Sequence, residues 1–179
     1  MKVLHVTLAA LVAAAVPTAA RAERIEARLT GYQEVPSVST PAHGEFNAKI
    51  SKDQQSISYQ LTFSDLVGTV TMSHIHIAQR GVSGAIVIWL CQTAAMPSPI
   101  ASTPMCPQSG TVTGTIMAAD VVATPTTSVS QLIAAGELNE VIAAIRAGVA
   151  YVNVHATPAN PGGEIRGQIK ASDDHDDHR

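Results

Sequence analysis

Three histidines are the residues in this sequence best suited to chemistry. His74 and His76 are two positions apart in the run SHIH, and His155 ends the run YVNVH. Both runs have the pattern of β-strands, in which residues two apart point to the same face. If the two strands are neighbours, three imidazoles converge, and neutral imidazole is a good ligand for zinc and copper. The spacing therefore predicts a mononuclear copper or zinc site at His74, His76 and His155, with an open fourth position.

A structural interpretation of the same histidines remains open. Buried imidazoles often hydrogen-bond to backbone groups, or they form a polar rim at the end of a barrel. In that case the protein is a partner-binding domain without a metal. The two interpretations differ in geometry, because a metal site requires three ring nitrogens that converge on one point.

Other potential metal ligands have weaker support. His43 precedes a predicted strand and is a candidate fourth ligand, but also an ordinary turn residue. Met96 and Met105 are thioethers that suit Cu(I), although methionines in loops are commonly incidental. The acidic, histidine-containing segment 173–178 lacks a rigid frame, so we expect a solvated tail there.

Motifs of common enzyme classes are absent from the sequence. It contains no G-x-S-x-G elbow, no glycine-rich phosphate loop and no H-E-x-x-H. Glu164 and Arg166 flank Ile165 and so share one face of a predicted strand, where we expect ion pairs with a neighbouring strand. Arg166 is also a candidate for substrate binding. The sequence therefore identifies no catalytic residues.

The elements that must position the histidines are mostly strands. Segment 56–63 alternates polar and apolar residues without a break, and segment 44–50 pairs with it as a hairpin. One helix is predicted near 138–145, where apolar residues recur at helical spacing and Gly148 follows. This pattern predicts an all-β fold, a Greek-key antiparallel sandwich or barrel of about eight strands with one short connecting helix. The remaining predicted strands cover 24–30, 70–77, 85–90, 110–117, 151–155 and 164–170.

The first 22 residues read as a secretory signal peptide. Lys2 precedes an apolar stretch, and Ala20-Arg21-Ala22 fits a cleavage site before Glu23. We therefore expect an exported protein, periplasmic or extracellular. Disulfides persist in those compartments, so Cys91 and Cys106 are predicted to be bonded, closing a proline-rich insert over 92–105.

Composition excludes two further classes of partner. The net charge is −3 and no basic block occurs, so a nucleic-acid-binding surface has no basis. No apolar run reaches the roughly 18 residues of a membrane span, so we expect none after signal cleavage. With 46% apolar but only 3% aromatic residues, the core must be aliphatic.

Several segments together resemble the CHRD domain, a module named after chordin. The resemblance implies a domain over 23–170, followed by a disordered acidic and histidine-containing tail over 171–179. It also implies an extracellular β-sandwich that binds an unknown protein or small ligand and needs no reaction, since chordin is a secreted antagonist of growth factors. The segments are 29–36 (LTGYQEVP), 73–76 (SHIH), 147–155 (AGVAYVNVH) and 163–169 (GEIRGQI).

A second resemblance concerns only the order of the histidine and arginine strands along the chain. An H-x-H strand, a later strand with a third histidine and an arginine in a glycine-rich last strand are similar in order to copper-zinc superoxide dismutase. It implies an alternative function, a small metal-dependent redox enzyme in which Arg166 steers an anion to the metal. The fourth copper ligand and the zinc loop of that family have no clear counterpart here, and layout alone does not establish a function.

Overall fold

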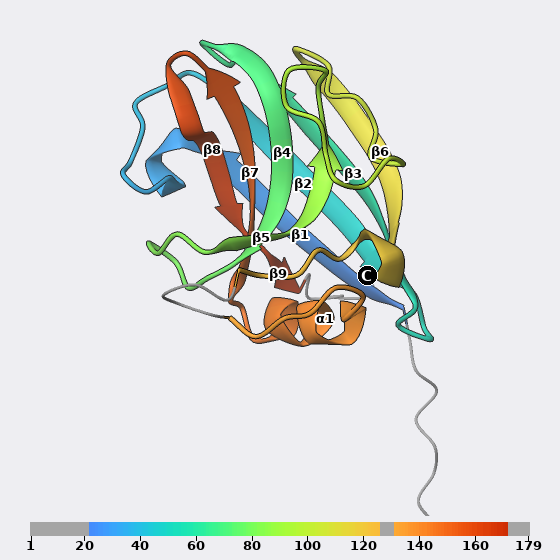
Figure 1. The fold of residues 1–179 in the computed structure, drawn as a ribbon. Coiled ribbons are helices and arrows are strands. Elements are labelled where there is room, and N and C mark those ends of the chain that lie inside the picture. The colour runs from blue at the N-terminus through green and yellow to red at the C-terminus, as the bar shows by residue number, and fades with distance from the viewer. Residues whose placement is uncertain (1–21, 126–130, 172–179) are drawn as a thin grey trace, which may run out of the picture.

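The computed structural model describes residues 22–125 and 131–171, and it confirms an all-β fold. Its antiparallel strands form one sheet that curls into a nearly closed barrel, with one α-helix at its end (Figure 1). The strands are β1 (Glu23–Thr30), β2 (His43–Ile50), β3 (Ser56–Ser64), β4 (Thr69–Ile77), β5 (Ala85–Cys91), β6 (Gly110–Met117), β7 (Ala150–Thr157), β8 (Asn160–Gln168) and β9 (Lys170–Ala171).

The order of strands around the barrel is β5-β4-β7-β8-β1-β2-β3-β6, with the short β9 paired to β1. The connections from β3 to β4 and from β6 to β7 join strands that are not neighbours, as in a Greek key. β5 and β6 are the two edges, and between them the ladder is incomplete. The Tyr59 hydroxyl donates to the Leu90 carbonyl (2.6 Å) and the Val122 amide to the Val87 carbonyl (2.9 Å), so the seam is bridged.

In one half of the barrel, buried and exposed residues alternate along the strands, as expected of a sheet with one solvent-exposed face. In β3, Ile57, Tyr59, Leu61 and Phe63 are buried while the residues between them are not. The other half differs, because β7 is buried on both faces along nearly its whole length. Something must therefore cover the outer face of β7 and its neighbours.

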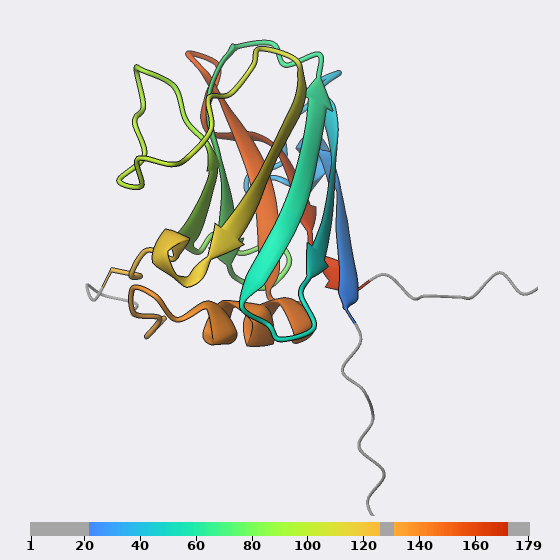
Figure 2. The ribbon, with the colours of Figure 1, turned by 90° about the vertical axis from the view of Figure 1, so that its right-hand side faces the viewer.

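Helix α1 (Leu138–Arg146) lies across one end of the barrel (Figures 1 and 2). Its apolar residues Leu138, Val141, Ile142 and Ile145 are all buried and join the core of the barrel. The helix ends before Gly148, which has φ +70° and so adopts the conformation that glycine takes most easily. The helix predicted from the sequence is confirmed in place and extent.

The predicted disulfide is also confirmed. Cys91, the last residue of β5, is bonded to Cys106. The segment between them projects from the barrel wall (Figure 2) and is tied at its base by hydrogen bonds from the Cys106 amide to the Gln92 carbonyl (2.8 Å) and from the Gln92 amide to the Pro104 carbonyl (2.9 Å). The insert is thus a pinned surface loop.

The described part of the chain begins and ends close to strands. β1 begins at Glu23, and β9 takes in Ala171, one residue beyond the expected domain boundary. The proposed signal peptide, apart from Ala22, and the tail segment 173–178 lie outside the described residues. Among the described residues, no helix is long and apolar enough to cross a membrane.

Candidate metal centre

The three histidines lie on the outer face of the β4-β7-β8 part of the barrel. The pairing of β4 with β7 sets His74 opposite Asn153 and Met72 opposite His155, so their side chains share one face. The alternate residues Ile75, Val152 and Val154 point the other way, into the core. Strand alternation therefore separates an apolar inner face from a polar outer face.

The outer face is buried because other segments cover it. The loop between β4 and β5 supplies the Gly84 carbonyl, which lies 2.9 Å from His76 Nδ1. The start of β8 supplies the Pro161 carbonyl, 2.9 Å from His155 Nδ1. On the neighbouring strand β5, the Trp89 ring packs edge-on against His74 with 4.2 Å between ring centroids. The exposed fractions of His74, His76 and His155 are accordingly 0%, 7% and 5%.

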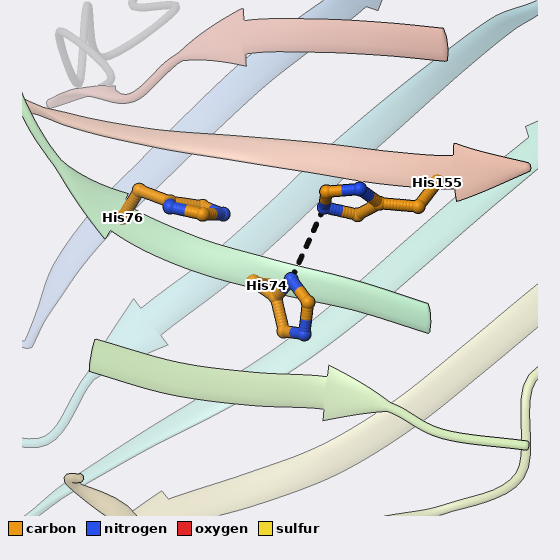
Figure 3. Close-up of side chains that lie close together, drawn as sticks. All are labelled: His74, His76 and His155. Carbon is orange, nitrogen blue, oxygen red and sulfur yellow. Dashed lines mark hydrogen bonds between the residues drawn. The ribbon is translucent and has the colours of Figure 1, made fainter. Parts of the chain in front are cut away.

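The structure brings the three predicted ligands together. Each offers a ring nitrogen that lies within 4.8 Å of those of the other two. His74 Nδ1 and His155 Nε2 are hydrogen-bonded at 3.2 Å. The rings of His76 and His155 lie between β4 and β7, and the ring of His74 lies on the β5 side of β4 with Nδ1 toward His155 (Figure 3). His76 is the outermost of the three, with its ring centroid 5.5 Å from that of His74 and 6.3 Å from that of His155.

The backbone carbonyls around the site define which ring nitrogens are free to bind. A carbonyl only accepts hydrogen bonds, so Nδ1 of His76 donates to Gly84 and Nδ1 of His155 donates to Pro161. Each of these neutral rings then keeps a bare Nε2. His76 Nε2 and His74 Nε2 are both buried and have no hydrogen-bond partner. For His76 this is the arrangement that a metal-binding histidine needs, with one nitrogen oriented by a carbonyl and the other free. His74 differs, because its Nδ1 donates to His155 Nε2.

Burial keeps the three imidazoles neutral. It lowers the pKa of His74 to about 2, an effect to which the neighbouring His155 and His76 add. It also lowers the pKa of His76 to about 4, although the Gly84 carbonyl acts in the opposite direction. The pKa of His155 is lowered by burial as well. Because only the neutral ring binds a metal, the site is ready for one at neutral pH.

A comparison with protein-family models adds the family of this fold. The CHRD domain model matches residues 25–169, which is most of the chain and includes all three histidines. The chain belongs to the CHRD family. No curated protein and no solved structure matches the chain, so neither comparison supports the layout resemblance to copper-zinc superoxide dismutase.

The weaker candidate ligands lie away from this cluster of the CHRD domain. His43 is exposed at the start of β2, where it contacts Ser64 and Asp65 and not the other histidines. Met96 and Met105 are exposed in the disulfide-closed insert.

The prediction for Glu164 and Arg166 is wrong. Neither forms an ion pair in the described part of the chain, and Arg166, with an exposed fraction of 2%, is no surface residue. The Glu164 carboxylate instead accepts hydrogen bonds from the Thr40 hydroxyl (2.6 Å) and the Val67 amide (2.9 Å), which pins two loops over β8. These loops cover the outer face, so both side chains are enclosed.

Arg166 is part of a stack that ends at the histidines. Its guanidinium lies 3.3 Å from the centroid of the Tyr151 ring, and Tyr151 stacks on His76 at 4.7 Å with an interplanar angle of 3°. Arg166 also donates to the Gln79 carbonyl at 3.2 Å. The stack fixes the plane of the His76 ring, so Arg166 positions that ring through Tyr151.

Two functional neighbours were not anticipated from the sequence. Asn153 is buried next to His155, with its Oδ1 3.0 Å from His155 Nε2. Glu34 is buried behind Asn153, and burial raises its pKa to about 7 against the lowering effects of Arg166 and Asn153. Asn153 carried a usable signal, because it alternates with Val152 and Val154 and so shares the face of His155. Glu34 carried none, since it lies in a loop.

Proposed function

We propose that this protein is an exported CHRD-domain binding module that holds one copper or zinc ion through His74, His76 and His155. The observation that carries the proposal is the buried cluster itself: each histidine offers a ring nitrogen within 4.8 Å of those of the other two, and His74 Nε2 and His76 Nε2 have no hydrogen-bond partner. Buried polar atoms without a partner are unfavourable by about 1–3 kcal/mol each, so such a group persists where it serves a purpose. An ion bound by these nitrogens would satisfy them.

Export is the second part of the proposal. It is supported by the signal-peptide pattern of the first 22 residues and by a disulfide, which is stable in oxidising compartments. The CHRD family is in keeping with both. On these grounds we place the protein in the periplasm or outside the cell.

Binding is favoured over catalysis by the enclosure of the site. A redox enzyme needs a ligand position that solvent and substrate can reach. The three rings are almost fully covered, and the guanidinium of Arg166, which the enzyme hypothesis uses to attract an anion, is stacked on Tyr151 instead. The proposal therefore involves no reaction.

The test is the metal content of the exported protein purified without a histidine tag, measured by mass spectrometry. We expect about one copper or zinc ion per chain. We expect the double variant His74→Ala/His76→Ala to lose it. A version truncated after Ala171 should keep it, because the tail carries no ligand of this site.

The variant His43→Ala is the matched control, since it removes an exposed histidine that lies outside the cluster. It should bind metal like the wild type. Absence of metal from the wild type, even after incubation with Zn²⁺ and Cu²⁺, would contradict the proposal. Metal that is lost only with the tail would contradict it as well.

A further inference from the structure

The amide side chain of Asn153 lies among the three histidines. Its position in β7 is opposite His74 on β4, and it is two residues before His155 on the same face. Its Oδ1 is 3.0 Å from His155 Nε2, and Asn153 is also near enough to His76 to raise the pKa of that ring. An oxygen with free lone pairs thus points into the cluster of ring nitrogens.

The orientation of this amide is set from behind. Asn153 Nδ2 and Glu34 Oε1 both press against Gly163, where a Cβ would overlap the carboxylate oxygen and would lie 2.9 Å from the amide nitrogen. A carboxylate attracts an N–H group and repels a carbonyl oxygen. A hydrogen bond from the Asn153 amide acts to lower the pKa of Glu34, so the amide nitrogen faces Glu34 and the amide oxygen faces the histidines.

The contact between Asn153 and His155 contains no hydrogen atom. His155 donates its one ring proton from Nδ1 to the Pro161 carbonyl, so its Nε2 carries no proton and accepts a hydrogen bond from His74 Nδ1. The amide oxygen of Asn153 has no proton either. Two acceptors 3.0 Å apart in a buried site repel each other, whereas a cation that touches both would be attracted by both.

The distances match the edges of a tetrahedral site. Ligand atoms at about 2.0–2.1 Å from a tetrahedral ion lie about 3.3 Å from one another. His155 Nε2 is 3.2 Å from His74 Nδ1 and 3.0 Å from Asn153 Oδ1. Once the proton of His74 has moved from Nδ1 to Nε2, these three atoms need to move by only a few tenths of an ångström to bind one ion. His76 Nε2 completes the set with a larger inward shift.

We propose that Asn153 Oδ1 is the fourth ligand of the ion, so that the site is a closed set of three nitrogens and one oxygen. This inference rests on the proposed function. An amide oxygen is a hard donor, which favours Zn²⁺ or Cu²⁺ over the soft Cu⁺. A site closed by four protein ligands holds its ion for structure or storage and leaves no position for a substrate.

The experiment measures the affinity of the full chain for Zn²⁺ by competition with a chromophoric chelator, and the visible spectrum of the Co²⁺ form. We expect Asn153→Ala to weaken Zn²⁺ binding about 10- to 100-fold. The Co²⁺ bands should also shift, because water replaces the amide oxygen. Affinity for Cu⁺, measured in the same way under reducing conditions, should change much less. Asn47→Ala is the matched control, since Asn47 is an exposed asparagine on β2.

The outcomes separate this inference from the proposed function. Equal Zn²⁺ affinity and equal Co²⁺ spectra for Asn153→Ala and the wild type would overturn the fourth ligand and leave the histidine site intact. Absence of Zn²⁺ and Co²⁺ binding by the wild type would overturn both. If Asn153→Ala does not fold, Asn153→Asp decides: a carboxylate ligand must shift the Co²⁺ bands, and an unchanged spectrum overturns the inference.

Discussion

The metal-free protein should lose stability steeply between pH 6 and pH 5. An unfolded chain protonates its histidines around pH 6.5, whereas burial lowers the pKa of His74 to about 2 and that of His76 to about 4 in the fold, and lowers the pKa of His155 as well. Because the pKa values of these bases are lowered in the fold, the free energy of unfolding is highest above about pH 6.5 and falls as the unfolded state gains protons at lower pH. Each such proton changes the free energy of unfolding by about 1.4 kcal/mol per pH unit.

One group acts in the opposite direction. Burial raises the pKa of Glu34 from 4.5 to about 7. Between pH 6 and pH 5 the folded state therefore holds a proton on Glu34 that the unfolded state mostly lacks, and this stabilises the fold as the pH falls. The unfolded state binds nearly three more protons than the folded state on the histidines and about one fewer on Glu34, so it binds about two more in total. The free energy of unfolding should therefore fall by about 2–3 kcal/mol from pH 6 to pH 5.

The assay is urea unfolding in the presence of EDTA, at several pH values between 7 and 5. The double variant His74→Gln/His155→Gln leaves one histidine to balance Glu34, so its stability should be nearly independent of pH over this range. Glu34→Gln should make the dependence steeper than in the wild type. Equal slopes for the wild type and the double variant would show that the buried histidines do not cause the pH dependence.

Three shorter predictions address other parts of the fold. Replacing Cys91 and Cys106 by serine should lower the free energy of unfolding by about 3 kcal/mol, because the bond closes a loop with a sequence separation of 15; a urea titration that shows under 1 kcal/mol would contradict this. Gly163→Ala should lower the melting temperature clearly, because φ is +131° and a Cβ would overlap a buried carboxylate, while Gly162→Ala, with open space, should not. Cu²⁺ should quench the fluorescence of Trp89, the single tryptophan, at one equivalent, since its ring packs on His74; unchanged emission with bound Cu²⁺ would place the ion elsewhere.

The strands and the helix were predictable because their patterns are local. The alternation in 56–63 becomes β3, and the helical spacing of apolar residues around 138–145 becomes α1, with ends that differ by at most one residue. The strand around 164–170 differs more, since β8 begins earlier, at Asn160. Its first residues include Pro161 and Gly162, which carry no strand pattern, so only pairing with β7 reveals them.

The site was predictable as far as strand geometry reaches. Alternation assigned His74 and His76 to one face of their strand, and the pairing of β4 with β7 brings His155 to the same face. It did not predict that this face is covered, because the covering segments carry no periodic pattern. Arg166 illustrates the difference: its face followed from alternation, but its burial depends on loops that contact it only in the folded chain.

The position of the site explains why a barrel with an ordinary core also encloses polar residues on its outside. The inner core is apolar and complete without the histidines, so the fold does not need them for packing. Their two unpartnered ring nitrogens are unfavourable by about 1–3 kcal/mol each in the metal-free protein. An ion present at 100 times its dissociation constant returns about 2.7 kcal/mol, which is of the same order. On the function proposed above, the binding of the ion is what completes this covered face.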